Sequence, residues 1–135
     1  MKSDEELKKA YRFYIGKDGI INLEFLVLLD DPKDRERIAE LVDARGDAIL
    51  AKDPGRQYNF LIDLSRIKKF KPMSPREQER YIKMIAKQQV NKIACIGLNP
   101  FYRTVAYLIV KLSGKLPRTG FFNSKKKAVV WLKEK

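Results

Sequence analysis

The chain has 135 residues, and its 29 Lys and Arg outnumber its 17 Asp and Glu, which gives a net charge of +12 at pH 7. This length suits one domain, and a hydrophobic content of 44% is sufficient for a packed core, which excludes the disordered, fibrous and collagen-like classes. The chain contains no His, which excludes Ser-His-Asp and Cys-His nucleophile systems, zinc sites built on paired His, and an imidazole pH switch.

The first residues, 1–9, are polar and are expected to form a flexible tail or a frayed helix ahead of a domain over 10–135. Residues 11–15 are rich in β-formers, and apolar side chains alternate along 20–29. Asp18-Gly19 between these segments is typical of a tight hairpin turn. The pattern predicts an antiparallel hairpin at the start of the domain.

Helices and strands alternate along the rest of the chain. The predicted elements are a helix over 33–52, a strand over 58–64, a helix over 75–89, a strand over 92–97, a helix over 100–113, a strand over 118–122 and a last helix capped at 123–124. The continuous apolar run at 58–64 is typical of a central strand buried on both faces. The order ββαβαβαβα with short connections predicts a single α/β domain, with a mixed, mostly parallel sheet of four or five strands and helices packed on it.

Three segments carry a family resemblance. The run from Asn59 to Ser65, the run from Lys92 to Gly97, and Phe121 to Ser124 leading into Ala128–Leu132 resemble the STAS superfamily, most closely its SpoIIAA-like, anti-sigma-factor-antagonist-like branch. The resemblance covers about residues 10–134 and rests on a pattern of strands and helices rather than a catalytic signature. It implies a mixed sheet of four or five strands, and roles in regulated protein binding, with nucleotide or lipid binding in some branches.

Ser74 allows two interpretations. In the anti-sigma-factor antagonists that the chain resembles, a phosphorylatable Ser or Thr in an Asp-Ser-like motif begins the helix that follows the strand matching Asn59 to Ser65, and Ser74 falls near that place. No Asp precedes it, however, and Pro75 follows. The alternative is that Ser74 is the N-cap of the helix, with Pro75 in its first position and Glu77 completing a capping box.

The positive charge belongs to the second half of the chain. Residues 1–55 carry 10 basic and 13 acidic side chains, whereas residues 56–135 carry 19 basic and 4 acidic ones. This asymmetry favours phosphate, nucleic acid, anionic lipid or an acidic protein as a partner. A Lys-rich surface also keeps a small domain in solution without any partner.

Three loops, at 65–74, 97–100 and 122–125, follow parallel strands and lead into helices through polar caps. Because ligands of open α/β sheets bind outside the carboxyl ends of the strands, we expect these loops to form a basic edge that binds a protein partner, a small anion or a lipid head group. Asp63 alone is a poor catalyst, so we expect neither an enzyme nor a metal or cofactor. The expected binding residues are Arg66, Lys68, Lys69, Lys71, Ser74, Asn99, Arg103, Ser124 and Lys125, with Arg76 and Lys126 beside them.

Two further hypotheses remain open. Phe70 lies among Lys68, Lys69 and Lys71, which loosely fits single-stranded nucleic-acid binding, although the ring could instead tuck under its own loop. The helix at 100–113 is apolar on more than one face, which indicates burial in the core, or contact with a partner, a lipid or a second copy in a homodimer.

The cellular compartment is predicted from Cys95 and from the hydropathy pattern. A lone Cys cannot form an internal disulfide, and it lies in the apolar run at 93–96, which favours a reducing compartment. No apolar stretch approaches about 18 residues, and the first residues contain no hydrophobic signal region. These features predict a cytoplasmic protein that is not an integral membrane protein.

Overall fold

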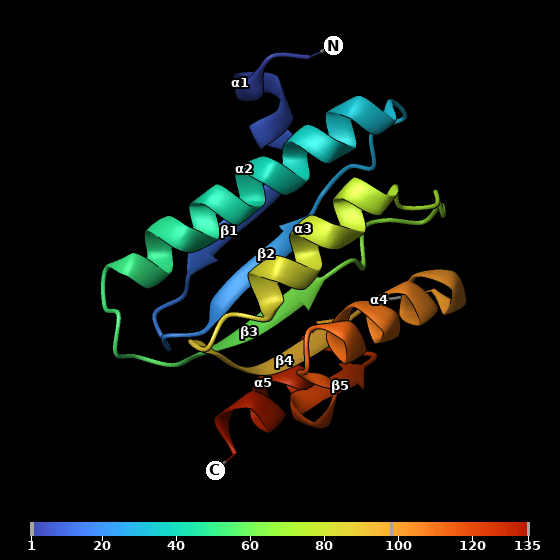
Figure 1. Ribbon diagram of the computed structural model, residues 1–135. Coiled ribbons are helices and arrows are strands. Elements are labelled where there is room, and N and C mark those ends of the chain that lie inside the picture. Colours follow the sequence, from blue (N-terminus) through green and yellow to red (C-terminus); the bar gives the residue numbers. More distant parts are fainter. Residues whose placement is uncertain (1, 98, 135) are drawn as a thin grey trace.

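The computed structural model describes residues 2–97 and 99–134. They form a single α/β domain around one five-stranded sheet (Figure 1). The elements are α1 (Asp4–Leu7), the 3-10 turn η1 (Lys8–Ala10), β1 (Tyr11–Ile15), β2 (Ile21–Phe25), α2 (Pro32–Ala51), β3 (Tyr58–Asp63), α3 (Pro75–Ile85), β4 (Val90–Ile96), α4 (Pro100–Leu112), the 3-10 turn η2 (Leu116–Arg118), β5 (Thr119–Phe122) and α5 (Lys125–Lys133).

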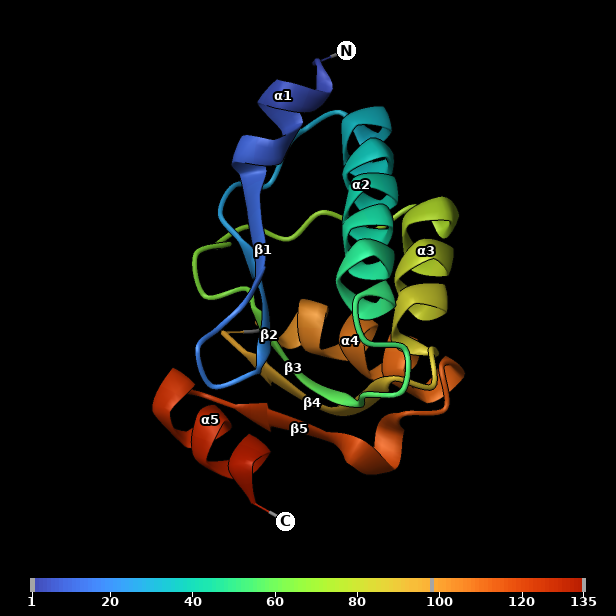
Figure 2. The ribbon, with the colours of Figure 1, turned by 90° about the vertical axis from the view of Figure 1, so that its left-hand side faces the viewer.

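The strands lie in the order β1-β2-β3-β4-β5. β1 and β2 form the predicted antiparallel hairpin, and all other neighbours are parallel. Because each parallel strand is added on the same side through a right-handed crossover, α2, α3 and α4 all cover one face of the sheet. Only α5 crosses to the other face (Figure 2). The predicted order ββαβαβαβα and the mixed, mostly parallel sheet are confirmed.

A hydrophobic layer packs against each face of the sheet. The larger layer lies between the sheet and α2, α3 and α4, and includes Phe60 and Ile93. The smaller layer lies under α5 and includes Leu61, Ala94 and Leu132. Successive residues of β3 therefore point into opposite layers, which confirms the prediction that this strand is central and buried on both faces.

The second strand ends at Phe25, four residues earlier than the sequence pattern predicts. Its partner β1 begins at Tyr11, directly opposite Phe25, and the chain before Tyr11 turns away as η1. The amides of Leu26 and Val27 therefore both donate to the carbonyl of Ala10, and Val27 is 54% exposed. The prediction of a strand up to residue 29 was wrong because alternating hydrophobicity does not supply a neighbouring strand.

The N-terminal segment, expected as a tail or a frayed helix, forms α1. Ser3 and Glu6 build a capping box at its start, and Leu7 is fully buried in the core. Arg37 of α2 donates to the carboxylate of Asp4 at 2.8 and 3.0 Å. These contacts fasten the segment against α2.

Candidate functional site

A hollow of about 480 Å³ opens at the carboxyl ends of β4 and β5. From this edge, α4 runs onto one face of the sheet, whereas α5 runs onto the other (Figure 2). Diverging helices leave a crevice between them, and such a crevice is where open α/β sheets bind ligands. The hollow is lined by Cys95, Gly97, Arg103, Phe121, Phe122, Asn123 and Lys127.

No acidic residue offsets the partial positive charge at the N-termini of α4 and α5. Asn99 caps α4 by accepting from the Tyr102 amide at 2.9 Å, and Ser124 caps α5 by accepting from the Lys127 amide at 3.2 Å. Neither first turn contains an acidic residue, and the first turn of α5 is made of lysines, whereas the first turns of α1, α2 and α3 each contain Asp or Glu. The positive ends of both helix dipoles therefore add to the charge of these lysines.

Two cations line the hollow from opposite helices. The guanidinium of Arg103, on α4, lies 5.1 Å from the ring centroid of Phe121, a cation–π distance. Lys127, on α5, is exposed at the other wall. Lys125 and Lys126 are exposed in the same first turn. An anion in the hollow would therefore meet positive charge from both sides.

The loop after β3 reaches the same edge, because Gly97 packs directly against Ser65. Ser65 is fixed in turn by Asp63, whose carboxylate accepts from the Ser65 amide at 2.8 Å and from its hydroxyl at 2.6 Å. Arg66, Lys68 and Lys69 follow as exposed residues of this loop. The structure thus brings the loops after β3, β4 and β5 to one edge, as expected.

The end of this loop is held by the start of α4. Phe70 packs against Phe101 and Tyr102, with ring centroids 5.2 and 4.9 Å apart. The amide of Lys71 donates to the Tyr102 hydroxyl at 3.2 Å, and the Lys71 ammonium pairs with Asp30 at 2.6 Å. Phe70 is therefore part of an aromatic cluster rather than a free platform for a base.

Ser74 stands apart from the hollow, at the start of α3. Its side chain accepts from the Glu77 amide at 3.2 Å, and the Glu77 carboxylate accepts from the Ser74 amide at 3.0 Å, so the expected capping box is confirmed. The Ser74 hydroxyl also donates to Glu36 of α2 at 2.7 Å. A phosphoryl group on Ser74 would meet two carboxylates, and this helix start already has its own anion.

We expect Ser74→Ala to lower the free energy of unfolding by about 1–2 kcal/mol, because the Glu77 amide loses its acceptor and Glu36 loses its donor. Chemical denaturation monitored by circular dichroism measures this change. Ser74→Asp keeps a cap but places a third carboxylate beside Glu36 and Glu77, so it should not restore the wild-type value. Full stability of Ser74→Asp would contradict the acidic surroundings described for this residue.

Only part of the apolar surface of α4 is buried in the core. Tyr102, Ile109 and Val110 are buried, whereas Phe101 is 65% and Leu112 is 67% exposed. Tyr107 and Leu108 are also exposed. The expected apolar surface on this helix therefore exists, and it runs from Phe101, which packs against Phe70 at the helix start, to Leu112 at the helix end.

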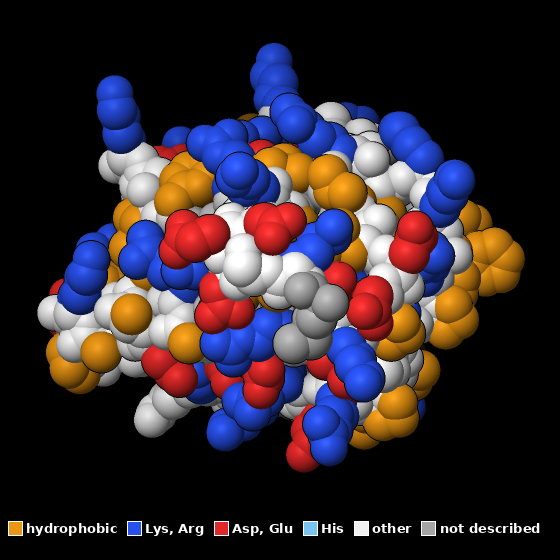
Figure 3. All heavy atoms as spheres, turned by 90° about the horizontal axis from the view of Figure 1, so that it is seen from above, with side chains coloured by type: hydrophobic (Ala, Val, Ile, Leu, Met, Phe, Trp, Pro, Cys, Tyr) orange, Lys and Arg blue, Asp and Glu red, His pale blue; other side chains and the backbone are white. Residues whose placement is uncertain are grey.

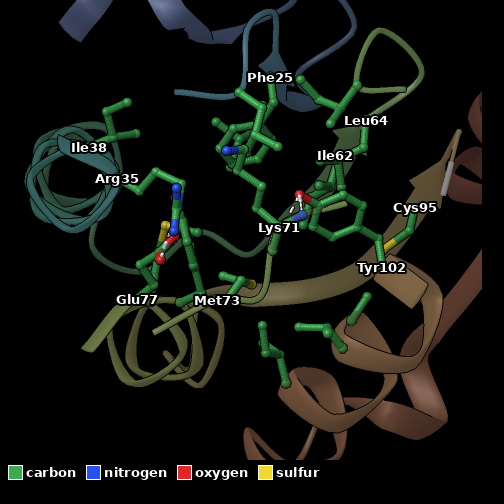
Figure 4. A pocket seen from close by; sticks show the side chains of 18 of the residues that line it. Phe25, Arg35, Ile38, Ile62, Leu64, Lys71, Met73, Glu77, Cys95 and Tyr102 are labelled. Atoms are coloured by element: carbon green, nitrogen blue, oxygen red, sulfur yellow. Dashed lines mark hydrogen bonds and ion pairs between the residues drawn. The ribbon is translucent and has the colours of Figure 1, made fainter. Parts of the chain in front are cut away.

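A second cavity, of about 120 Å³, lies between the sheet and α2, α3 and α4 (Figure 4). Arg35 and Glu77 pair within its wall, and Cys95 reaches it from β4. Burial raises the pKa of the Cys95 thiol to about 12, so the side chain is a hydrophobic lining group rather than a nucleophile. The sequence patterns did not indicate this cavity.

Charges of both signs are mixed on the face of the molecule that Figure 3 shows. On the face seen from above, acidic and basic side chains are interleaved, and hydrophobic side chains show on the right, at the lower left and along the upper part (Figure 3). Ion pairs such as Arg80 with Asp43 at 3.3 Å tie α3 to α2. Over residues 2–97 and 99–134, no cluster of three or more Cys, Asp or Glu side chains is placed to hold a metal ion.

Comparison with known proteins found no relative of this chain. No protein-family model matches the chain, and no curated protein matches it. Within the described part of the chain, no helix combines the length and the apolar character needed to cross a membrane.

Proposed function

We propose that the chain is a non-enzymatic binding module of STAS type, which holds an anionic group of a protein partner or a small ligand in the hollow at the ends of β4 and β5. The proposal rests on one observation. The N-termini of α4 and α5, which lack acidic residues, meet at one crevice, and Arg103 and Lys127 line this crevice. The side chains that line it offer cations, an amide, aromatic rings and the buried Cys95 thiol, whose pKa burial raises to about 12, which suits binding rather than proton transfer.

The expected affinity for an isolated anion is modest. A helix N-terminus favours an anion by roughly 0.3–1 kcal/mol, so two of them supply at most about 2 kcal/mol. A millimolar dissociation constant corresponds to about 4 kcal/mol, so direct contacts with Arg103 and Lys127 must supply the rest. Tighter binding needs additional contacts, and the exposed side chains of Phe101 and Leu112 on α4 are available to a protein partner.

We expect the double variant Arg103→Ala/Lys127→Ala to weaken the binding of inorganic phosphate and of a phosphoserine peptide at least about tenfold, because each charge-assisted contact contributes about 1.5–3 kcal/mol. Titration followed by amide chemical shifts measures both affinities and shows whether the signals of Gly97 and Asn123 move. A peptide that binds more tightly than phosphate would favour a protein partner over a free anion.

The control variant is Lys17→Ala/Lys52→Ala, which removes the same charge from exposed positions before β2 and β3, at the amino ends of the parallel strands. It should leave both affinities within about twofold, whereas equal weakening by the two variants would contradict the proposed site. The alternative function, non-specific nucleic-acid binding through the basic half, predicts that oligonucleotide affinity collapses between about 50 and 200 mM salt regardless of sequence.

A further inference from the structure

The cavity between the sheet and α2, α3 and α4 has its own lining, of which it shares only Cys95 with the hollow at the ends of β4 and β5. Ile62 and Cys95 line it from the face of the sheet that α2, α3 and α4 cover. Val105, Ala106 and Ile109 line it from α4. Most of the lining is hydrophobic. A cavity of about 150 Å³ lined by such side chains stays dry and holds benzene, so a volume of about 120 Å³ accommodates a group of about five or six carbon atoms.

Two irregular segments of the chain line the cavity, and one of them carries Val27, a lining residue that is 54% exposed and marks the mouth of the cavity. Val27 and Leu28 line it from the segment after β2, and Lys71 and Met73 line it from the loop before α3. The Lys71 ammonium joins the two segments by pairing with Asp30 at 2.6 Å. Because the Asp30 side chain is 90% exposed, this ion pair can exchange its carboxylate for another one at little cost.

The charges around the cavity are not balanced. Arg35 and Glu77 neutralise each other, with side chains only 10% and 5% exposed, and Arg35 also donates to the carbonyls of Leu29 and Asp30 at 2.8 and 2.9 Å. Lys71 is the remaining charged lining residue among those described, and its aliphatic stem lies along the loop side of the cavity (Figure 4). The mouth therefore presents one positive charge above an apolar interior.

We propose that this cavity binds the apolar end of a small anionic amphiphile, whose carboxylate or phosphate head replaces Asp30 as the partner of Lys71. The interior accepts the hydrocarbon part, and the exposed mouth leaves the head group in contact with water. This site shares neither Arg103 nor Lys127 with the hollow at the ends of β4 and β5, so either site can fail without the other.

The first test is a titration with hexanoate and with 1-hexanol, followed by the methyl signals of Ile62 and Ile109. We expect saturable shifts in the wild-type chain. Ala106→Leu fills the cavity from α4 and should abolish these shifts, whereas Ala44→Leu, at an exposed position of α2, should leave them unchanged. Shifts that persist in Ala106→Leu, or an absence of shifts in the wild type, would overturn the proposal.

The second test concerns the head group. Lys71→Met retains the apolar stem and removes the charge, so it should weaken hexanoate binding about tenfold and change 1-hexanol binding less than about twofold. Asp30→Asn removes the competing carboxylate and should strengthen hexanoate binding by about two- to fivefold. If Lys71→Met weakened the binding of hexanoate and of 1-hexanol equally, the carboxylate would not bind at Lys71 and the proposal would fail.

Discussion

Gly97→Ala is expected to lower the free energy of unfolding by about 3–5 kcal/mol, from backbone strain and steric overlap together. Gly97 has φ +72°, a left-handed conformation that residues with a Cβ atom seldom adopt. A Cβ atom at this position would lie 2.3 Å from the Cα and 2.4 Å from the backbone nitrogen of Ser65. Ser65 cannot yield easily, because its amide and hydroxyl are both bound to Asp63. Urea denaturation measures the loss.

Two glycines separate the two causes. Gly114 has φ +81° but open space around it, so Gly114→Ala should cost only about 1 kcal/mol. Gly55 has open space and no positive φ, so Gly55→Ala should be neutral or stabilising by up to about 1 kcal/mol. If Gly97→Ala cost no more than Gly114→Ala, the close approach of the loops after β3 and β4 would be wrong.

This close approach also matters for the hollow. Gly97 lines it, and its contact with Ser65 brings the basic loop after β3 next to the start of α4. A side chain at position 97 must push these loops apart, which would change the spacing between Arg66 and Arg103. The sequence alone does not reveal this contact, because the distance from Gly97 to Ser65 depends on how two neighbouring strands end.

Most of the fold could be predicted because its signals are local. Alternating or continuous hydrophobicity marks the strands, and Ser74, Asn99 and Ser124 each mark a helix start that the structure confirms as a side-chain cap. The parallel order follows from short connections and right-handed crossovers. These features need no knowledge of distant contacts.

The site was harder to predict because it depends on contacts between distant segments. Ser74 and Ser124 carry the same kind of cap, yet Ser74 faces Glu36 and Ser124 begins a helix that lies on the opposite face of the sheet. Which way a helix turns after its strand depends on the apolar surface that remains uncovered. The residues after Phe25 continue the alternating pattern of a strand, but β1 does not extend beside them. They therefore lie at the mouth of the cavity instead of in the sheet.

The buried pair of Arg35 and Glu77 gives the second large prediction. Glu77→Ala is expected to lower the free energy of unfolding by about 3 kcal/mol, because it leaves the largely buried Arg35 guanidinium without a counter-charge. It also removes the acceptor of the Ser74 amide. Thermal and urea denaturation should agree on this loss. Glu79→Ala removes an exposed carboxylate from the same helix and should change stability by less than about 0.5 kcal/mol.

A double variant distinguishes loss of charge balance from loss of packing. Arg35→Met/Glu77→Met replaces both charges by apolar side chains, and such exchanges of a buried pair are often neutral or stabilising. We expect it to recover part of the loss seen in Glu77→Ala. Recovery should be incomplete, because Arg35 also binds the carbonyls of Leu29 and Asp30 at the mouth of the cavity. A double variant less stable than Glu77→Ala would show that these carbonyl contacts, rather than the ion pair, hold the segment after β2 against α2.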